Sequence, residues 1–192
     1  MNRDRILGDV EKDYLMSLAK AHAAFTGVEV LSACIMSNHF HFLIRVPSRP
    51  AEITEKEIWG RMKNIYGRQK LEDFKAHLDD LKEKGHELAI KGFWDGMRRR
   101  MYDLSEYVKE VKQRFSSWYN GLHDRKGTLW EERFKSLLVE GERGALAAVA
   151  AYIALNPIRA GLVKDPKDYR WSTYSEAVTG GKLARKGIIA AL

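Results

Sequence analysis

Two neighbouring runs of β-forming residues constrain the fold most. Residues 28–36 (VEVLSACIM) and 40–46 (FHFLIRV) are rich in β-branched and aromatic side chains, which favour strands. Ser37-Asn38 between them has the composition of a turn, and Pro47 follows the second run. The pattern predicts two adjacent strands joined as a hairpin.

Helical patterns surround this hairpin. Apolar residues recur at helical spacing over residues 10–25 and again over 104–119, and residues 54–114 as a whole are rich in helix formers. Glycines divide residues 54–114 into two or three expected helices. The remaining expectations are a strand or hairpin arm over 129–140, an alanine-rich helix over 144–155 stopped by Asn156-Pro157, and an irregular tail from Lys164. This order predicts an α+β fold, with an antiparallel sheet covered mainly on one face by helices.

Length and composition suit a soluble chain. The 192 residues, 45% hydrophobic and 31% charged, predict a single domain over residues 1–178, with a helical insertion at about 52–101 and a C-terminal tail at 179–192. The single cysteine, Cys34, cannot form an internal disulfide. Residues 1–10 do not resemble a signal peptide and no apolar run could span a membrane, so we expect a cytoplasmic protein without a membrane partner. The net charge of +7 favours polyanionic partners such as nucleic acid.

His39 and His41 are the sharpest local chemical feature. They stand two positions apart on a predicted strand, so both imidazoles should project from one face while Phe40 projects from the other. Two imidazoles at this spacing can supply two ligands to one metal ion. Two histidines satisfied by neighbouring groups are the alternative interpretation.

Tyr152 and Asn156 form a second candidate pair. Their i, i+4 spacing puts a phenol and a carboxamide on one helical face. Facing the histidines, Asn156 could add an oxygen ligand, which suits Mg²⁺ or Mn²⁺, and Tyr152 could point at whatever the metal polarises. The alternative is a core tyrosine and an asparagine that caps the helix before Pro157.

Four sequence blocks in one order carry a resemblance to a known family. They are residues 36–44 (MSNHFHFLI), 127–136 (GTLWEERFKS), 152–163 (YIALNPIRAGLV) and 171–174 (WSTY). Together they resemble the REP-associated tyrosine transposases, a branch of the single-tyrosine HUH superfamily related to IS200-like transposases. The resemblance extends from about residue 2 to 174, and residues 52–101 match poorly.

The resemblance implies a ferredoxin-like HUH fold and a role for each site residue. His39 and His41 match the metal-binding pair, Asn156 the third ligand and Tyr152 the nucleophile, with Mg²⁺ or Mn²⁺ as the cofactor. Tyr152 would form a 5′-phosphotyrosine bond with single-stranded or hairpin DNA, and the released 3′-OH could later rejoin the strand.

Further expectations concern DNA contacts and assembly. Cations in or beside the matching blocks are expected to contact phosphates, and the protein would act as a monomer or homodimer. These cations are Arg133, Lys135, Arg159 and Lys164. Relatives usually have a strand before the segment that matches Met1-Asn2-Arg3, so the first strand of the sheet is expected to be missing here.

Two rival functions follow from the same residues. A decayed or domesticated relative would bind structured nucleic acid without cutting it. A metal-dependent phosphodiesterase would use water in place of Tyr152.

Overall fold

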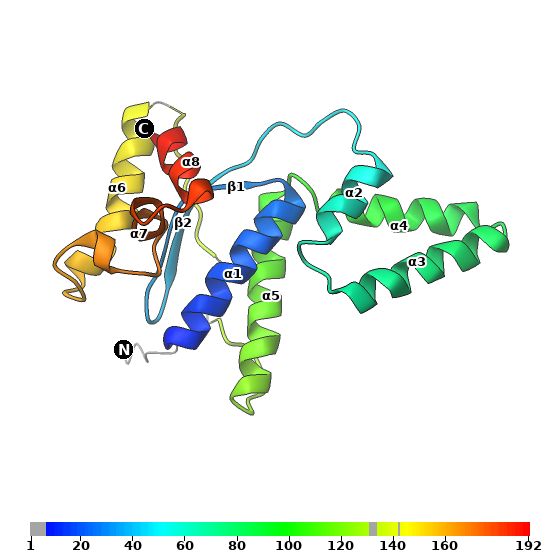
Figure 1. Ribbon diagram of the computed structural model, residues 1–192, viewed down its shortest axis with the longest axis horizontal. Coiled ribbons are helices and arrows are strands. Elements are labelled where there is room, and N and C mark those ends of the chain that lie inside the picture. Colours follow the sequence, from blue (N-terminus) through cyan, green and yellow to red (C-terminus); the bar gives the residue numbers. More distant parts are fainter. Residues whose placement is uncertain (1–6, 131–133, 142) are drawn as a thin grey trace. The chain divides into compact units, whose positions relative to one another are not determined.

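The computed structural model describes residues 7–130, 134–141 and 143–192. Within these ranges the chain forms helices and one β-hairpin (Figure 1). In chain order the elements are α1 (Asp9–Thr26), β1 (Glu29–Ile35), β2 (Phe40–Arg45), α2 (Glu55–Met62), α3 (Arg68–Glu83), α4 (Glu87–Arg99), α5 (Leu104–Leu122), α6 (Arg143–Arg159), the 3-10 helix η1 (Pro166–Asp168), α7 (Thr173–Val178) and α8 (Lys182–Ala191).

The chain divides into two units. Unit 1 contains residues 1–17, 29–45 and 112–192, and therefore the hairpin and every described helix from α6 onward. Unit 2 contains residues 18–28 and 46–111, which include the predicted insertion at 52–101. Two of the boundaries, after Ser17 and Val111, fall inside α1 and α5, so each of these helices contributes residues to both units.

The predicted hairpin is confirmed. β1 and β2 pair antiparallel, with Cys34 opposite His41 and Ile35 opposite Phe40, and an irregularity interrupts the register between Val30 and Ser32. Together with the helices, this two-stranded sheet confirms the α+β class. The more specific ferredoxin-like HUH arrangement stays a prediction.

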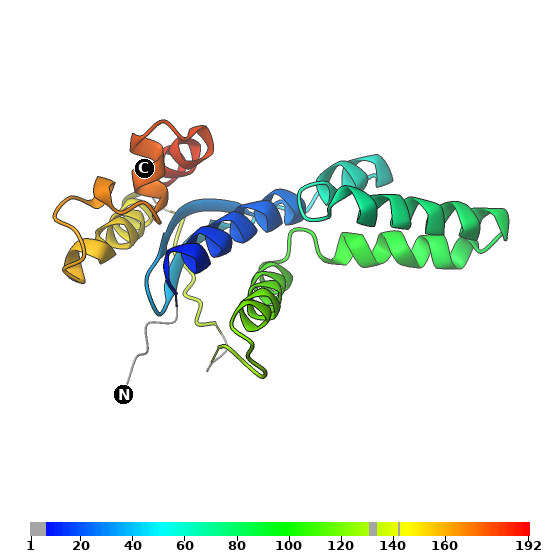
Figure 2. The ribbon, with the colours of Figure 1, turned by 60° about the horizontal axis from the view of Figure 1, so that its bottom comes forward.

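The core of unit 1 lies between the hairpin and two helices. α6 contacts both strands, α8 contacts β1, and both helices lie beside the hairpin in Figures 1 and 2. Gly187 of α8 lies directly on the β1 backbone, where a Cβ would meet the Val30 carbonyl oxygen at 2.7 Å. The buried residues of this core are Leu31, Cys34, Met36, Leu43, Ala150, Ile153, Tyr169 and Ala191.

The segment before α7 extends the pairing of β1. The Ile35 amide donates to the Trp171 carbonyl at 2.9 Å, and the Ala33 amide donates to Thr173 Oγ1 at 2.8 Å. Much of the free edge of β1 is thus hydrogen-bonded, as buried backbone groups require.

The two faces of β2 carry different chemistry. Phe40 and Phe42 contact each other with ring centroids 4.9 Å apart, and Phe40 meets Trp130 at 5.6 Å. Trp130 in turn packs against Phe115 of α5 at 5.6 Å. His41, between the two phenylalanines, belongs to the other face because side chains alternate along a strand.

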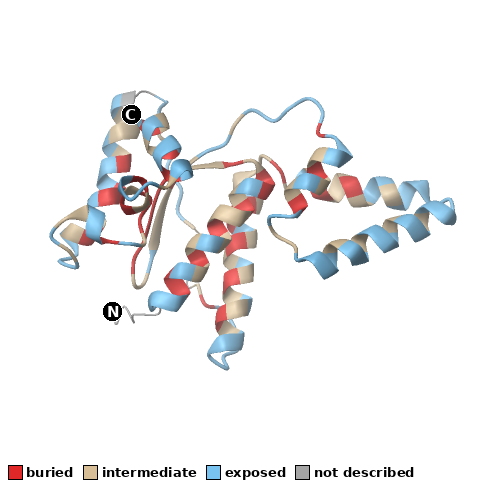
Figure 3. Ribbon diagram, in the orientation of Figure 1, coloured by how far each residue is buried: buried red, intermediate tan, exposed pale blue. Residues whose placement is uncertain are grey.

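Unit 2 has its own apolar core. Residues 54–114 contain α2, α3, α4 and the start of α5, one helix more than the two or three expected, and α5 confirms the helix predicted over 104–119. None of the residues of α3 is buried (Figure 3), whereas α2 and α4 each bury two residues. The buried core residues are Phe25, Ile53, Ile58, Met62, Trp94, Met97 and Met101.

Three expectations about local structure were wrong. The described residues of 129–140 form no strand, and Leu137 and Leu138 are both exposed. The neighbouring leucines break the alternation that a half-buried strand requires. Residues 131–133, which belong to the same predicted strand, lie outside the described residues.

The alanine-rich helix also ends later than expected. α6 continues through Pro157 to Arg159, with Pro157 buried in its last turns. The helical hydrogen bonds continue after Pro157, because the backbone amide of Ala160 donates to the Asn156 carbonyl at 3.0 Å. Gly161, at φ +68°, ends the turn in the left-handed conformation that glycine tolerates.

The tail from Lys164 is mostly helical and not irregular. η1, α7 and α8 lie in this part of the chain, and α8 docks on β1 through Gly187 and Ala191. Asp165 and Ser172 cap η1 and α7 through their side chains, and burial against β1 stabilises α8. Among the described residues, no helix is both long and apolar enough to cross a membrane.

Candidate functional site

His39 and His41 lie at the start of β2. His39 immediately precedes the strand and is exposed, whereas His41 is its second residue and is half-buried. Their ring centroids are 4.9 Å apart and the rings meet edge to face at 86°. The two imidazoles are therefore neighbours, as their spacing along the chain predicts.

The surroundings of these rings favour the form that binds metals. Burial, and second the nearby charge of His39, lower the pKa of His41 below its ordinary value of 6.5. His41 is thus neutral at pH 7, the form in which an imidazole binds a metal. His39 Nδ1 lies 2.7 Å from Asn38 Oδ1, and an Nδ1–H donated to this oxygen leaves the lone pair on Nε2.

Tyr152 of α6 lies against His41. The ring centroids are 5.8 Å apart and the planes meet at 81°. Ile153 and Ala150 are buried in the core shared with Leu43 of β2, and this packing holds α6 beside the strand. Tyr152, on the flank of that buried face, is 46% exposed, so its ring touches the histidine and is open to solvent.

Asn156 lies one turn after Tyr152. Its Nδ2 donates to the Tyr152 carbonyl at 3.0 Å, so the amide nitrogen is used within α6. A nitrogen directed at the helix leaves Oδ1 as the atom that can bind a metal or accept a hydrogen bond. Tyr152, and not Asn156, makes the ring contact with the histidine pair.

The predicted DNA-contacting cations lie in different places. Arg159 is exposed in the last turn of α6, with its Cζ 5.1 Å from the centroid of the Tyr152 ring. Lys135 and Lys164 are exposed outside the regular elements. Arg133 lies outside the described residues. The structure thus brings Arg159 to the tyrosine.

The side chains around the histidine pair limit which groups could hold a metal ion. In the described parts of the chain, no three or more His, Cys, Asp and Glu side chains gather as a metal site. Cys34 is opposite His41 in the sheet, but burial raises the pKa of its thiol to about 12, so it remains protonated. The neighbouring imidazoles of His39 and His41 are the candidate metal donors here, and Asn156, which bonds to Tyr152 through its nitrogen, has an oxygen that could join them.

Two contacts were missed from the sequence. The sequence predicts Asn38 only as a turn residue, whereas in the structure its Oδ1 lies 2.7 Å from His39 Nδ1. Arg159 was expected to contact phosphate, and its position over the Tyr152 ring was not foreseen. The seven-residue spacing of Tyr152 and Arg159, two helical turns, was the available signal.

Comparisons with protein families, with curated proteins and with solved structures found no match to this chain.

Proposed function

We propose that this protein cleaves and rejoins single-stranded or hairpin DNA through a covalent bond to Tyr152, as a transposase-like enzyme of the cytoplasm. The observation that carries the proposal is the exposed Tyr152 ring beside the histidine pair at the start of β2. A solvent-accessible phenol next to two neighbouring imidazoles brings a nucleophile and metal donors together.

The reaction is a transfer of a phosphodiester bond. The Tyr152 oxygen attacks the scissile phosphorus, the bond from phosphorus to the 3′ oxygen breaks, and a 5′-phosphotyrosine linkage forms. The phenol gives up one proton to solvent or a base, and the leaving 3′ oxygen takes one up. Attack by a 3′-OH on the phosphotyrosine reverses these steps and rejoins DNA without ATP, because the linkage conserves the bond energy.

His39, His41 and Asn156 would hold the divalent ion. A bound Mg²⁺ or Mn²⁺ supplies positive charge that makes the phosphate a better electrophile. The low pKa of His41 keeps its ring a donor at neutral pH. Asn38 orients His39 through the hydrogen bond to Nδ1.

The charge distribution supports an anionic substrate. Residues 112–192 contain 14 lysines and arginines against 8 aspartates and glutamates. In the proposal, Arg133, Lys135, Arg159 and Lys164 contact phosphates along the bound strand.

Covalent capture of DNA tests the proposal. The protein is incubated with Mn²⁺ and a hairpin carrying single-stranded flanks, labelled in turn at its 5′ end and at its 3′ end. Adducts are resolved on a denaturing gel. We expect an adduct that retains the label of the 3′ fragment and is absent in Tyr152→Phe. Tyr174→Phe, a half-buried tyrosine of α7 in the same unit, is the control and should form the adduct.

Each rival function gives a different result. Cleavage that persists in Tyr152→Phe would indicate a phosphodiesterase that uses water. Binding of the hairpin without an adduct or cleavage would indicate a non-cleaving nucleic-acid binder. Replacing His39 and His41 with alanine, or adding a chelator, should abolish the adduct, and an adduct that persists would contradict the proposed metal site.

A further inference from the structure

Two side chains contact the Tyr152 ring: His41 from β2 and Arg159 from the same helix, α6. The His41 ring meets it nearly perpendicular, with centroids 5.8 Å apart. The Arg159 guanidinium lies 5.1 Å from the ring centroid. An aromatic ring attracts a cation to its face and meets another ring favourably at an edge. Both contacts therefore restrict how the tyrosine can turn.

The contact with Arg159 requires a specific conformation. Seven residues separate Tyr152 from Arg159, so the side chain must extend back along about 10 Å of helix axis. Side chains of a helix lean toward its N-terminus, which makes that reach possible. A cation in the last turn is already favoured by the helix dipole wherever its side chain points. The dipole therefore does not account for the guanidinium lying over the ring.

We infer that Arg159 is a positioning residue that holds the Tyr152 ring against His41 in the orientation used for attack. The inference rests on the proposed function and goes beyond a phosphate contact, because it assigns Arg159 a role before DNA binds. At 46% exposed, Tyr152 has little packing around it that would otherwise fix its ring. A small misplacement of a nucleophile lowers a reaction rate strongly.

Substituting Arg159 with lysine or alanine distinguishes stacking of its planar guanidinium on the ring from the effect of its positive charge alone. Arg159→Lys keeps the positive charge but loses the planar group that stacks on a ring. Arg159→Ala loses both. Lys186→Ala, an exposed cation of α8 in the same unit, is the matched control for loss of one charge. Thermal unfolding of each variant establishes that it folds.

The first measurement is independent of activity. The protein is labelled with 3-fluorotyrosine, and the ¹⁹F resonance of Tyr152 is assigned by its loss in Tyr152→Phe. We expect Arg159→Ala to move this resonance toward that of free fluorotyrosine and to narrow it. The resonance of Arg159→Lys should lie closer to that of Arg159→Ala than to that of wild type. Lys186→Ala should leave it in place. An unchanged resonance in Arg159→Ala would overturn the inference.

The second measurement separates rate from affinity. With saturating hairpin DNA and Mn²⁺, we expect Arg159→Ala and Arg159→Lys to slow adduct formation about 10-fold or more in a single turnover. The Kd for DNA should change less than about 3-fold in Arg159→Lys, since its charge is retained. Weaker binding with an unchanged rate would make Arg159 a phosphate contact only and overturn the inference.

The two measurements also separate the inference from the proposed function. A wild-type protein that forms no adduct would refute the proposed function. The ¹⁹F spectrum would still decide whether Arg159 holds the ring of Tyr152.

Discussion

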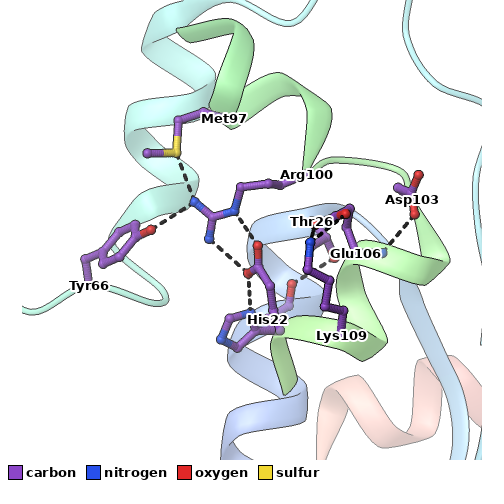
Figure 4. A network of polar contacts seen from close by, with 9 residues as sticks. His22, Thr26, Tyr66, Met97, Arg100, Asp103, Glu106 and Lys109 are labelled. Atoms are coloured by element: carbon purple, nitrogen blue, oxygen red, sulfur yellow. Dashed lines mark hydrogen bonds and ion pairs between the residues drawn. The ribbon is translucent and has the colours of Figure 1, made fainter. Parts of the chain in front are cut away.

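Glu110 of α5 is the centre of a partly buried polar network in unit 2. Figure 4 shows its partners Arg100 and His22, with Tyr66 beside the guanidinium. Arg100 donates to both carboxylate oxygens of Glu110, and the buried His22 places Nδ1 3.2 Å from Oε2. Arg100 also donates to Tyr66 Oη at 2.9 Å and lies over the Phe25 ring with Cζ 4.4 Å from the centroid. One carboxylate thus links residues of α1, α5 and the end of α4.

Replacing this carboxylate should destabilise the fold. Glu110→Gln keeps the shape of the side chain but leaves the partly buried Arg100 guanidinium without its counter-charge, which should cost about 1–3 kcal/mol. The free energy of unfolding at pH 7, from urea titration, measures the change. Glu72→Gln, which breaks an exposed pair with Arg68 on α3, should change it by less than about 1 kcal/mol. Equal effects of the two variants would contradict this account of the network.

Glu110 should also make stability depend on acid pH. Burial acts to raise the pKa of Glu110, but hydrogen bonds from His22 and Arg100 and their charges outweigh it, and the pKa falls from its ordinary 4.5 to about 2. The folded protein therefore releases this proton more readily than the unfolded chain. Its contribution to stability is complete above about pH 4.5 and is lost as pH falls toward 2.

Urea titrations between pH 2 and 7 check this dependence. We expect the difference in unfolding free energy between wild type and Glu110→Gln to shrink over the pH range from about 4.5 to 2. A difference that stays constant over this range would show that the carboxylate charge is not its source.

At the scale of elements, α8 requires a glycine where it crosses β1. A Cβ on Gly187 would lie 2.7 Å from the Val30 carbonyl oxygen and 2.9 Å from that of Leu31. Both neighbours are backbone atoms of a paired strand and cannot rotate away, so the helix itself must move.

Gly187→Ala should therefore destabilise unit 1 by about 1–3 kcal/mol, through the strain of overpacking. Gly92→Ala is the matched control, because Gly92 lies inside α4 and a Cβ there would have no neighbouring atom within 4 Å. At that position the same change should stabilise by about 0.4–1 kcal/mol, since alanine favours the helix. Thermal and urea unfolding of both variants measure the contrast, and a stabilising Gly187→Ala would refute the close approach.

The two faces of strand β2 have different roles: one packs against aromatic side chains and the other carries a candidate site residue. Phe40 contacts Phe42 and Trp130 on one face, whereas His41 meets Tyr152 of α6 on the other. The alternation of side chains along a strand makes this division possible within three consecutive residues. The candidate site therefore depends on how α6 docks, because the strand provides only its histidines.

At the scale of the whole molecule, the net charge of +7 predicts salt-dependent binding of DNA. The proposed function implies that the logarithm of the DNA association constant falls linearly with the logarithm of salt concentration, by about 0.7 for each phosphate contact on a single strand. Fluorescence anisotropy with a labelled hairpin at about 50–300 mM salt measures this slope. Lys135→Ala and Lys164→Ala should each reduce its magnitude by about 0.7, whereas Lys186→Ala should leave it unchanged. A slope near zero would argue against phosphate contacts altogether.

Several features could be predicted from the sequence because they depend on local patterns. The hairpin followed from β-forming residues around Ser37-Asn38, and the amphipathic helices followed from apolar spacing. The neighbouring imidazoles of His39 and His41 followed in the same way, since a period of two puts alternate side chains on one face.

Tertiary packing decided the rest. The position of α8 depends on burial against β1, as the close approach of Gly187 to the Val30 carbonyl shows. The contact of Tyr152 with His41 joins residues 111 positions apart in the chain, and the docking of α6 on the hairpin sets it. The sequence by itself determined which chemical groups each element carries. Only the tertiary structure decided which of these groups meet, because contacts between distant segments depend on how buried surfaces fit together.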